Sequence, residues 1–530
     1  MALINELPAR GRPTALRSIR GTQPERAATP AIAGPRAKAG RLWLHLHLPQ
    51  LPLEVLIRGS EAARACVLVD GGNRRTRILL TNSRAAALGI RAGMALEAAH
   101  AMAELTVIER QTHTERQALA QICQWAVQFT PVVSAVPPDG LVLEIRGSLR
   151  LFDGVQGLSR RLRQGLRELG YRAEYAVAPT PLAAALLART EPRTVLHELP
   201  ELLPALAHLP LTALRLDAAA HATLAQLGVR QLGDCRRLPR AGLARRLSPA
   251  LLDLFDRLFG QVADLRPVFE LPRQFEADID LPWEVDNARG LLCAAERLLH
   301  ELQGYLVANS AMTRRLGWRL IDRQGAREDF QLNLTRPGRD CRQLLLLMRE
   351  TLARRRLGLP VRRIGLYVDD LVFGTTSPPQ DLFVRRPQES DEAYAGFIDR
   401  LRARCGDDAL RGLRLESGHR PEYAFRWQRP AAVDERQRVA AAPVPTRGPR
   451  TQRPLWLLER PLRLETQGER PWLDGPLRLY PERERIQGGW WDGEQMDRDY
   501  FRATTSRGGR LWVYRELRGP GQWYLHGIFD

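Results

Sequence analysis

Lysine is almost missing from this chain of 530 residues, in which Lys38 is the single lysine. Arginine therefore supplies nearly all of the 79 basic residues, and the formal net charge is +19 with an isoelectric point near 10.6. A positive surplus of this size favours a polyanionic partner such as nucleic acid. A genome rich in arginine codons is the plainer explanation, so charge alone leaves the partner open.

Paired cysteines and long apolar runs are missing as well. The six cysteines are scattered along the chain: Cys66, Cys123, Cys235, Cys293, Cys341 and Cys405. None forms a C-x-x-C pair, which argues against a zinc site or a disulfide framework and suits a reducing cytosol. No apolar run approaches the ~20 residues that cross a bilayer, so we expect a cytoplasmic protein without a membrane partner.

Residues 1–40 are rich in Pro, Ala, Gly and Arg and lack a periodic apolar pattern. This composition predicts a disordered basic leader, and a start codon assigned too early is an equal alternative. No apolar core follows the arginines, so the segment is not a secretory signal. The remaining length exceeds what one core can hold, and three to five domains are expected.

Two alternating stretches predict strands. In residues 41–48 the leucines share one face, and Trp43, His45 and His47 share the other. Residues 137–145 begin with a Pro-Pro-Asp-Gly turn and continue as a short strand. Asp139 and Glu144 lie five residues apart, so an extended strand points them to opposite sides. They cannot easily hold one metal ion together.

A hairpin pattern at 66–80 precedes a short helix that ends in Leu88-Gly89-Ile90, then Gly93-Met94 and a second helix at 95–103. A strand at 172–178 is followed by Pro179-Thr180-Pro181 and a helix. With the strand at 42–48 and Asp139, the order and spacing of these landmarks resemble the fingers and palm of Y-family (translesion) DNA polymerases. The resemblance implies an α+β multidomain protein of right-hand polymerase architecture with an added C-terminal β-rich domain.

The resemblance also divides the chain. The expected parts are the leader at 1–40, a palm-like part at 41–52 and 113–190, fingers at 53–112, a helix-hairpin-helix thumb at 191–262, a little finger at 275–386, a linker at 387–452 and a β-rich interaction domain at 453–530. Several aromatic residues of the last part could stack nucleic-acid bases, although core or protein-binding roles are the plainer interpretation.

The positions that carry catalysis in the family are changed here. His45 and His47 stand at the two acids of the first palm strand, and Gly140 replaces the acid next to Asp139. In the nucleotide site, Ser83 and Ala86 replace the Tyr and Arg of the fingers, and Pro181 replaces a Lys. We therefore expect no catalytic residue among His45, His47, Ser83, Ala86, Asp139, Gly140 and Pro181.

Active family members use two magnesium ions held by carboxylates, and a single carboxylate cannot assemble such a site. We expect no metal and no cofactor, with magnesium as the alternative if the chain is active. His45, His47 and Asp139 could in principle bind a transition metal. The plainer interpretation is two partly exposed histidines on a strand.

The resemblance places DNA contacts in the thumb and the little finger. Residues 224–232 have the Leu-x-x-Leu-Gly-Val-x-x-Leu form of a helix-hairpin-helix, whose backbone N–H groups at Gly228, Val229 and Arg230 suit a phosphate. A plain turn between two helices is the alternative. Further phosphate contacts are expected from Arg314, Arg315, Arg354, Arg355, Arg356, Arg362 and Arg363.

A short peptide at Gln380, Asp381, Leu382 and Phe383 resembles the bacterial sliding-clamp motif, with its Gln shifted by one position. A local packing role is the alternative. The strand at 42–54, the Pro-Asp-Gly strand and the Gly-Trp-Trp-Asp-Gly sequence at 489–493 resemble the catalytically degenerate mutasome branch of the family, the ImuB type.

Membership of that branch would imply a scaffold of the SOS response to DNA damage. It would bind DNA, the sliding clamp, a RecA-like accessory protein and an error-prone polymerase subunit of the alpha type. Two alternatives stay open: an active Y-family translesion polymerase of low efficiency, and a structure-specific repair factor without a polymerase partner.

Overall fold

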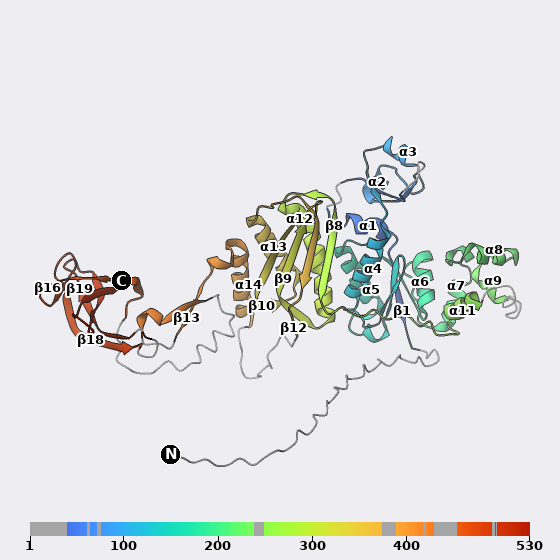
Figure 1. Ribbon diagram of the computed structural model, residues 1–530. Coiled ribbons are helices and arrows are strands. Elements are labelled where there is room, and N and C mark those ends of the chain that lie inside the picture. The colour runs from blue at the N-terminus through green and yellow to red at the C-terminus, as the bar shows by residue number, and fades with distance from the viewer. Residues whose placement is uncertain are drawn as a thin grey trace, which may run out of the picture.

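The computed structural model describes residues 40–60, 64–71, 76–237, 249–373, 388–416, 420–428, 453–489, 493 and 495–530. Almost all of the predicted leader and the whole clamp-like peptide at 380–383 lie outside these ranges. The elements occur in the order that the sequence predicts, with mixed helices and strands followed by a β-rich C-terminal region (Figure 1). The predicted fold class is confirmed.

The palm-like part is built on an antiparallel sheet. Its strands, in spatial order, are β5 (Val133–Val136), β6 (Gly140–Glu144), β1 (Trp43–His47) and β7 (Glu174–Ala178). β1 is central, and its register pairs Trp43 with Glu144 and His47 with Gly140. Both strands predicted from alternation are thus present.

Helices cover both faces of this sheet. One face packs on α1 (Leu51–Ile57), α4 (Thr112–Ala126) and α5 (Gly154–Glu168) through the leucines of β1 and β6. The other face packs on α6 (Pro181–Thr190), α7 (Leu199–Leu206) and α11 (Pro249–Leu258). The second face carries Trp43 and His45, so these side chains are enclosed between the sheet and the following helices.

The fingers-like part contains the predicted hairpin, in which β2 (Cys66–Val69) pairs with β3 (Ile78–Thr81). A strand that sequence reasoning missed, β4 (Thr106–Glu109), lies parallel to β2. The two short helices are α2 (Ser83–Ala87) and α3 (Leu96–His100). The Asn82 side chain accepts a hydrogen bond from the backbone N–H of Ala85 at 2.9 Å and caps α2.

The predicted thumb is helical, with α8 (Ala218–Gln226) and α9 (Leu232–Arg237) following α7. Beyond α11 a second sheet begins. Its strand order is β10 (Arg327–Gly338), β9 (Ala311–Ile321), β11 (Val361–Val368) and β8 (Phe275–Val285), and β12 (Leu371–Phe373) pairs with β9. The helices α12 (Ala288–Ala308) and α13 (Cys341–Arg354) pack on one face of this sheet, as Figure 1 shows.

Helix α14 (Gln388–Cys405) falls in the predicted linker but packs against the preceding unit. Ala395, Ile398 and Asp399 are buried, and the Asp399 carboxylate accepts hydrogen bonds from the backbone N–H and the hydroxyl of Thr335 on β10, both at 2.7 Å. The segment also contains a small hairpin of β13 (Gly412–Leu415) and β14 (Phe425–Gln428). The predicted domain boundaries stay predictions.

The C-terminal region forms a five-stranded antiparallel sheet. Its order is β15 (Trp456–Arg463), β21 (Trp523–Ile528), β20 (Arg510–Glu516), β19 (Met496–Thr504) and β18 (Arg478–Gly488), with a small hairpin of β16 (Glu465–Gln467) and β17 (Arg470–Trp472). Tyr500 stacks on Trp512 with ring centroids 4.0 Å apart, inside a core of aromatic residues. These rings are therefore unavailable for stacking on bases. Within the described ranges, no helix is long and apolar enough to span a membrane.

Candidate functional site

His45 is buried in the middle of the palm-like sheet. Only 2% of its surface is exposed, and its Nδ1 atom has no hydrogen-bond partner. Burial, together with the nearby charges of His47 and three arginines, holds the pKa of His45 well below its ordinary value, so the ring is neutral at pH 7. The interpretation of two partly exposed histidines is wrong for His45, because α6 and the thumb-like helices cover its face of the sheet.

The His45 ring occupies the space above Gly140. A Cβ atom built on Gly140 would lie 2.5 Å from Nε2 of His45 and 3.0 Å from the backbone oxygen of Leu46. No side chain fits there without displacing the imidazole. The glycine at position 140, where the family resemblance implies an acid next to Asp139, is therefore matched to the histidine at position 45.

Asp139, the carboxylate that remains, is bound by an arginine. Nη2 of Arg215 lies 2.5 Å from Oδ2 of Asp139, and Nδ1 of His47 lies 3.8 Å from the same oxygen. Arg215 comes from the loop before α8, so this ion pair joins the thumb-like helices to the palm-like sheet. Burial lowers the pKa of His47, although Asp139 opposes the shift, and the contact involves a largely neutral imidazole. Nothing in the sequence near Arg215 indicated this role.

Glu144 lies at the opposite end of β6 from Asp139. Its Oε1 atom accepts hydrogen bonds from the backbone N–H groups of Leu42 and Arg146, each at 3.2 Å. The prediction that Asp139 and Glu144 do not form one site is confirmed by the register, which pairs Glu144 with Trp43 and Gly140 with His47.

A cavity of about 170 Å³ lies next to these residues, between β1, the end of β5, α6 and α11. We call it the His45 pocket. Its polar lining consists of His45, Asp139, Arg189, Arg215 and Arg266, and its walls are apolar, with Leu182, Leu186, Leu214, Leu254 and Leu258 among them. Three guanidinium groups thus face one carboxylate.

This set of side chains does not fit the two magnesium ions that the family resemblance implies. Magnesium requires several hard oxygen ligands, and the pocket offers one carboxylate that an arginine already neutralises. Among the described residues, no group of three or more His, Cys, Asp or Glu side chains is placed to hold a metal ion. The positive surroundings oppose any further cation.

The remaining altered positions lie apart from the His45 pocket lining. Ser83 and Ala86 are exposed on α2, and neither side chain carries a positive charge that could hold a triphosphate. Pro181 is buried at the start of α6, where Thr180 caps the helix by accepting a hydrogen bond from the N–H of Ala183. The helix on which the resemblance places a Lys is present as α6, but Pro181 provides no amine at that position.

A turn with Gly228 at φ +75° joins α8 and α9 where the sequence predicts a helix-hairpin-helix, which stays a prediction. Its backbone donors are already engaged. The N–H groups of Arg230 and Gln231 donate to the carboxylate of Asp234, at 3.2 and 3.0 Å, and those of Gly228 and Val229 donate to carbonyls of α8. The Val229 side chain is buried. A phosphate would have to displace Asp234, so only the exposed Arg230 side chain is directly accessible.

The predicted phosphate-binding arginines of the second sheet fall into three groups. Arg314, Arg315, Arg354 and Arg356 are exposed, and no hydrogen bond or ion pair ties their side chains to another described residue. Arg355 and Arg363 are engaged: Arg363 binds Asp280 at 2.5 Å, and Arg355 binds Glu328 at 2.7 Å. Arg362 is half-buried, and its Nη1 atom is buried without a partner.

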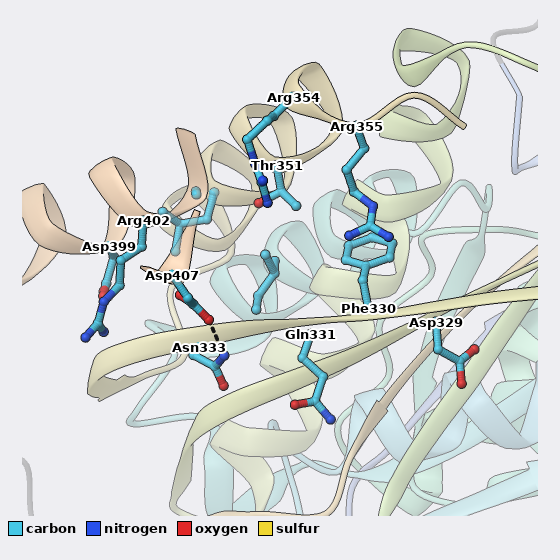
Figure 2. Close-up of a pocket in the computed structure, with 13 residues that line it drawn as sticks. Asp329, Phe330, Gln331, Asn333, Thr351, Arg354, Arg355, Asp399, Arg402 and Asp407 are labelled. Carbon is cyan, nitrogen blue, oxygen red and sulfur yellow. Dashed lines mark hydrogen bonds between the residues drawn. The ribbon is translucent and has the colours of Figure 1, made fainter. Parts of the chain in front are cut away.

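Figure 2 shows Arg354 and Arg355 at a cavity of about 460 Å³ between β10, α13 and α14. The Arg355 guanidinium lies over the ring of Phe330, 4.8 Å from its centroid. The Asn333 amide donates to Asp407 at 3.1 Å across the cavity. Acidic and basic side chains alternate around this cavity, so it has no single charge sign that would select a ligand.

The sheet face opposite α12 and α13 carries carboxylates that sequence reasoning missed. In β8 the apolar residues alternate with Glu276, Asp278 and Asp280. Arg319 of β9 binds Glu276 at 3.1 Å, and Arg363 of β11 binds Asp280. The alternation of residues 275–281 was the available signal for this mixed-charge face.

Comparisons with known proteins find a matching family model and similar proteins. Residues 58–189 match the model of the impB/mucB/samB family, designated IMS. Two proteins named "Protein ImuB", from Caulobacter vibrioides strains NA1000 / CB15N and ATCC 19089 / CIP 103742 / CB 15, are each 29% identical over 461 residues. Each alignment covers 80% of this chain and 96% of the relative.

Among solved structures, an insertion ternary complex of Dbh DNA polymerase is similar with a TM-score of 0.36 and 16% identity. DinB from Sulfolobus solfataricus is similar with a TM-score of 0.34 and 18% identity. Both cover 63% of this chain and the whole of the other chain. Residues 58–189 thus match the impB/mucB/samB family model, and the chain is similar to the ImuB proteins over most of its length.

Proposed function

We propose that this chain is a non-catalytic, DNA-binding scaffold of error-prone translesion synthesis. The observation that carries the proposal is the state of the palm-like site, where Arg215 holds Asp139 and His45 fills the space above Gly140. A site that binds its own arginine in place of two cations cannot activate a primer hydroxyl by the two-metal mechanism.

The homology to ImuB proteins supports a role in damage-induced mutagenesis rather than in bulk replication. In this role the chain holds DNA and brings together the sliding clamp, a RecA-like accessory protein and an error-prone polymerase subunit, which performs the synthesis. The exposed arginines Arg314, Arg315, Arg354 and Arg356 supply sequence-independent phosphate contacts.

A primer-extension assay with the purified full chain tests the absence of catalysis. We expect no templated nucleotide addition with magnesium or manganese, and the same result for Asp139→Ala. Arg160→Gln changes an exposed arginine of α5 and is the control for effects that any substitution or purification could cause. Templated synthesis that disappears in Asp139→Ala but persists in Arg160→Gln would establish the alternative, an active translesion polymerase of low efficiency.

The partner assignment is tested separately by binding. Changing Leu382 and Phe383 together to Ala should weaken binding to the sliding clamp at least tenfold in calorimetry, because a clamp peptide is anchored by its apolar side chains. Unchanged affinity would remove the clamp contact from the proposal. Failure to capture the polymerase subunit with the full chain would favour a repair factor that acts without such a partner.

A further inference from the structure

We propose that the His45 pocket binds a phosphate group. The inference concerns the cavity between the palm-like sheet and the thumb-like helices, not the surface arginines. The site would take the anion directly, through side chains, without a bridging metal ion.

The first observation is a guanidinium without an ion-pair partner of its own. In the pocket Arg215 binds Asp139, and Arg266 binds Asp264 at 2.7 Å. Arg189 of α6 has no hydrogen bond or ion pair with any other described residue, and its Nε atom is buried. Burial and the neighbouring Arg215 lower the pKa of Arg189, although Asp139 opposes the shift, so the charge of Arg189 is only partly compensated. Such a charge is costly to enclose and favours an anion beside it.

The second observation is the unpartnered ring of His45. Its ring lines the same cavity, and its Nδ1 atom is buried without a hydrogen-bond partner. As a neutral ring, His45 can donate one hydrogen bond to an oxyanion without adding a charge. A buried polar atom without a partner is rare, and one in a ring that lines a positively charged cavity points to a ligand that accepts hydrogen bonds.

The third observation is size. A cavity of about 170 Å³ has room for a phosphate group but lies well below the ~300–1,000 Å³ of sites that enclose a drug-sized ligand. A whole nucleotide therefore does not fit. The polar lining supplies the oxyanion contacts, while the leucine walls exclude water and strengthen those contacts. The phosphate can belong to the DNA backbone or be free in solution.

Thermal unfolding of the full chain tests the site, with sodium phosphate or pyrophosphate compared with sodium chloride at equal ionic strength. We expect the phosphates to raise the midpoint of the wild type, because a ligand of the folded state stabilises it. Arg189→Met should abolish this response. Without phosphate, Arg189→Met should unfold at a higher temperature than the wild type, since the partly compensated charge is gone.

Arg160→Met is the matched control, because Arg160 is an exposed arginine on α5, and this variant should keep the full response to phosphate. Equal responses of wild type and Arg189→Met, or no response of the wild type to either phosphate, would overturn the proposal. A variant that loses the response but melts well below the wild type would also contradict it, because the charge would then be satisfied within the protein.

Fluorescence anisotropy with a primer–template duplex distinguishes the two sources of phosphate. If a backbone phosphate occupies the pocket, Arg189→Met should weaken DNA binding about tenfold, and pyrophosphate should compete with DNA for the wild type. If the ligand is a free anion, DNA affinity should be equal in both proteins while the thermal response still differs. Either result supports a phosphate site. The first identifies the ligand as a phosphate of the DNA backbone, and the second identifies it as a free anion.

Discussion

Gly140 and His45 share one small volume between the palm-like sheet and the helices that cover it. The ring of His45 lies where a side chain at position 140 would project, and the two residues sit on neighbouring strands of the same sheet. A bulky residue at one position therefore requires a small one at the other. This dependence separates the chain from a polymerase with acids at both positions.

Gly140→Ala should destabilise the fold by about 1–3 kcal/mol, because a methyl group would overlap the His45 ring. Chemical denaturation at pH 7 measures this loss. Gly147→Ala, at a glycine with open space around its Cβ direction, should change stability little. In the double variant His45→Ala/Gly140→Ala, part of the loss should be recovered. An Ala at position 140 that is tolerated as well as one at 147 would contradict the packing described.

Among the larger elements, α1 and α12 meet through a buried ion pair. Arg58, directly after α1, donates to Glu301 of α12 at 2.5 Å, and both side chains are almost fully enclosed. Gly304 on the same helix lies against Trp125 of α4. These contacts fix the second sheet and its helices against the palm-like part.

Glu301→Gln should destabilise the protein by about 3–5 kcal/mol, because it leaves the Arg58 charge buried without a partner. Equilibrium denaturation in urea provides the measurement. The double variant Arg58→Met/Glu301→Leu removes both charges and should regain most of that loss. If the double variant is no more stable than Glu301→Gln, charge balance alone does not explain how the pair of Arg58 and Glu301 stabilises the protein.

A second helix contact predicts a pH dependence. Burial raises the pKa of Glu54 on α1 to about 7, although its carboxylate accepts a hydrogen bond from the backbone N–H of Arg172 at 3.0 Å. The folded protein thus holds this proton at a pH where the unfolded chain has lost it. The free energy of unfolding should therefore fall as pH rises from about 4.5 to 7, by up to about 3 kcal/mol.

Denaturation curves at several pH values check this slope in the wild type and in Glu54→Gln. The variant cannot release the proton and should lose most of the dependence between pH 4.5 and 7. Glu97→Gln, on the small helix α3 at an exposed position, is the control and should keep the wild-type slope. Identical slopes in all three proteins would contradict the role of Glu54.

How well an element or a contact could be predicted depends on how far apart in the sequence the contacting residues lie. Alternation in residues 41–48 and 140–144 predicted β1 and β6, because both strands are apolar on a fixed face. The residue types also predict too few carboxylates for two magnesium ions, and this stays a prediction. The partners that fill the site could not be predicted, since Arg215 lies 76 residues from Asp139 and Glu301 lies 243 residues from Arg58. No local pattern encodes such pairs.

The positive charge of the whole molecule is divided between arginines that are unpaired and arginines that form ion pairs with carboxylates. On the second sheet, Arg314 and Arg315 are exposed and unpaired with any described residue, whereas Arg319 and Arg363 bind carboxylates of β8. A net charge of +19 therefore overstates the number of arginines that are available to phosphates. DNA binding should depend on the unpaired group.

Changing Arg314 and Arg315 together to Gln should weaken duplex binding and reduce the slope of log affinity against log salt by about two. Anisotropy titrations between low and moderate sodium chloride give this slope. The charge-neutral double variant Arg363→Gln/Asp280→Asn removes an ion pair and should leave the slope unchanged. Equal losses in the two double variants would show that pairing within the sheet does not decide which arginines meet DNA.

The ion pair between Arg215 and Asp139 has a consequence for any attempt to build a cluster of carboxylates in the His45 pocket. An acid introduced at position 45 would still find Asp139 occupied, and an acid introduced at position 140 would collide with the imidazole ring. Neither single substitution therefore produces a free pair of carboxylates. Such a pair requires simultaneous change at positions 45, 140 and 215, which lie on three separate segments of the chain.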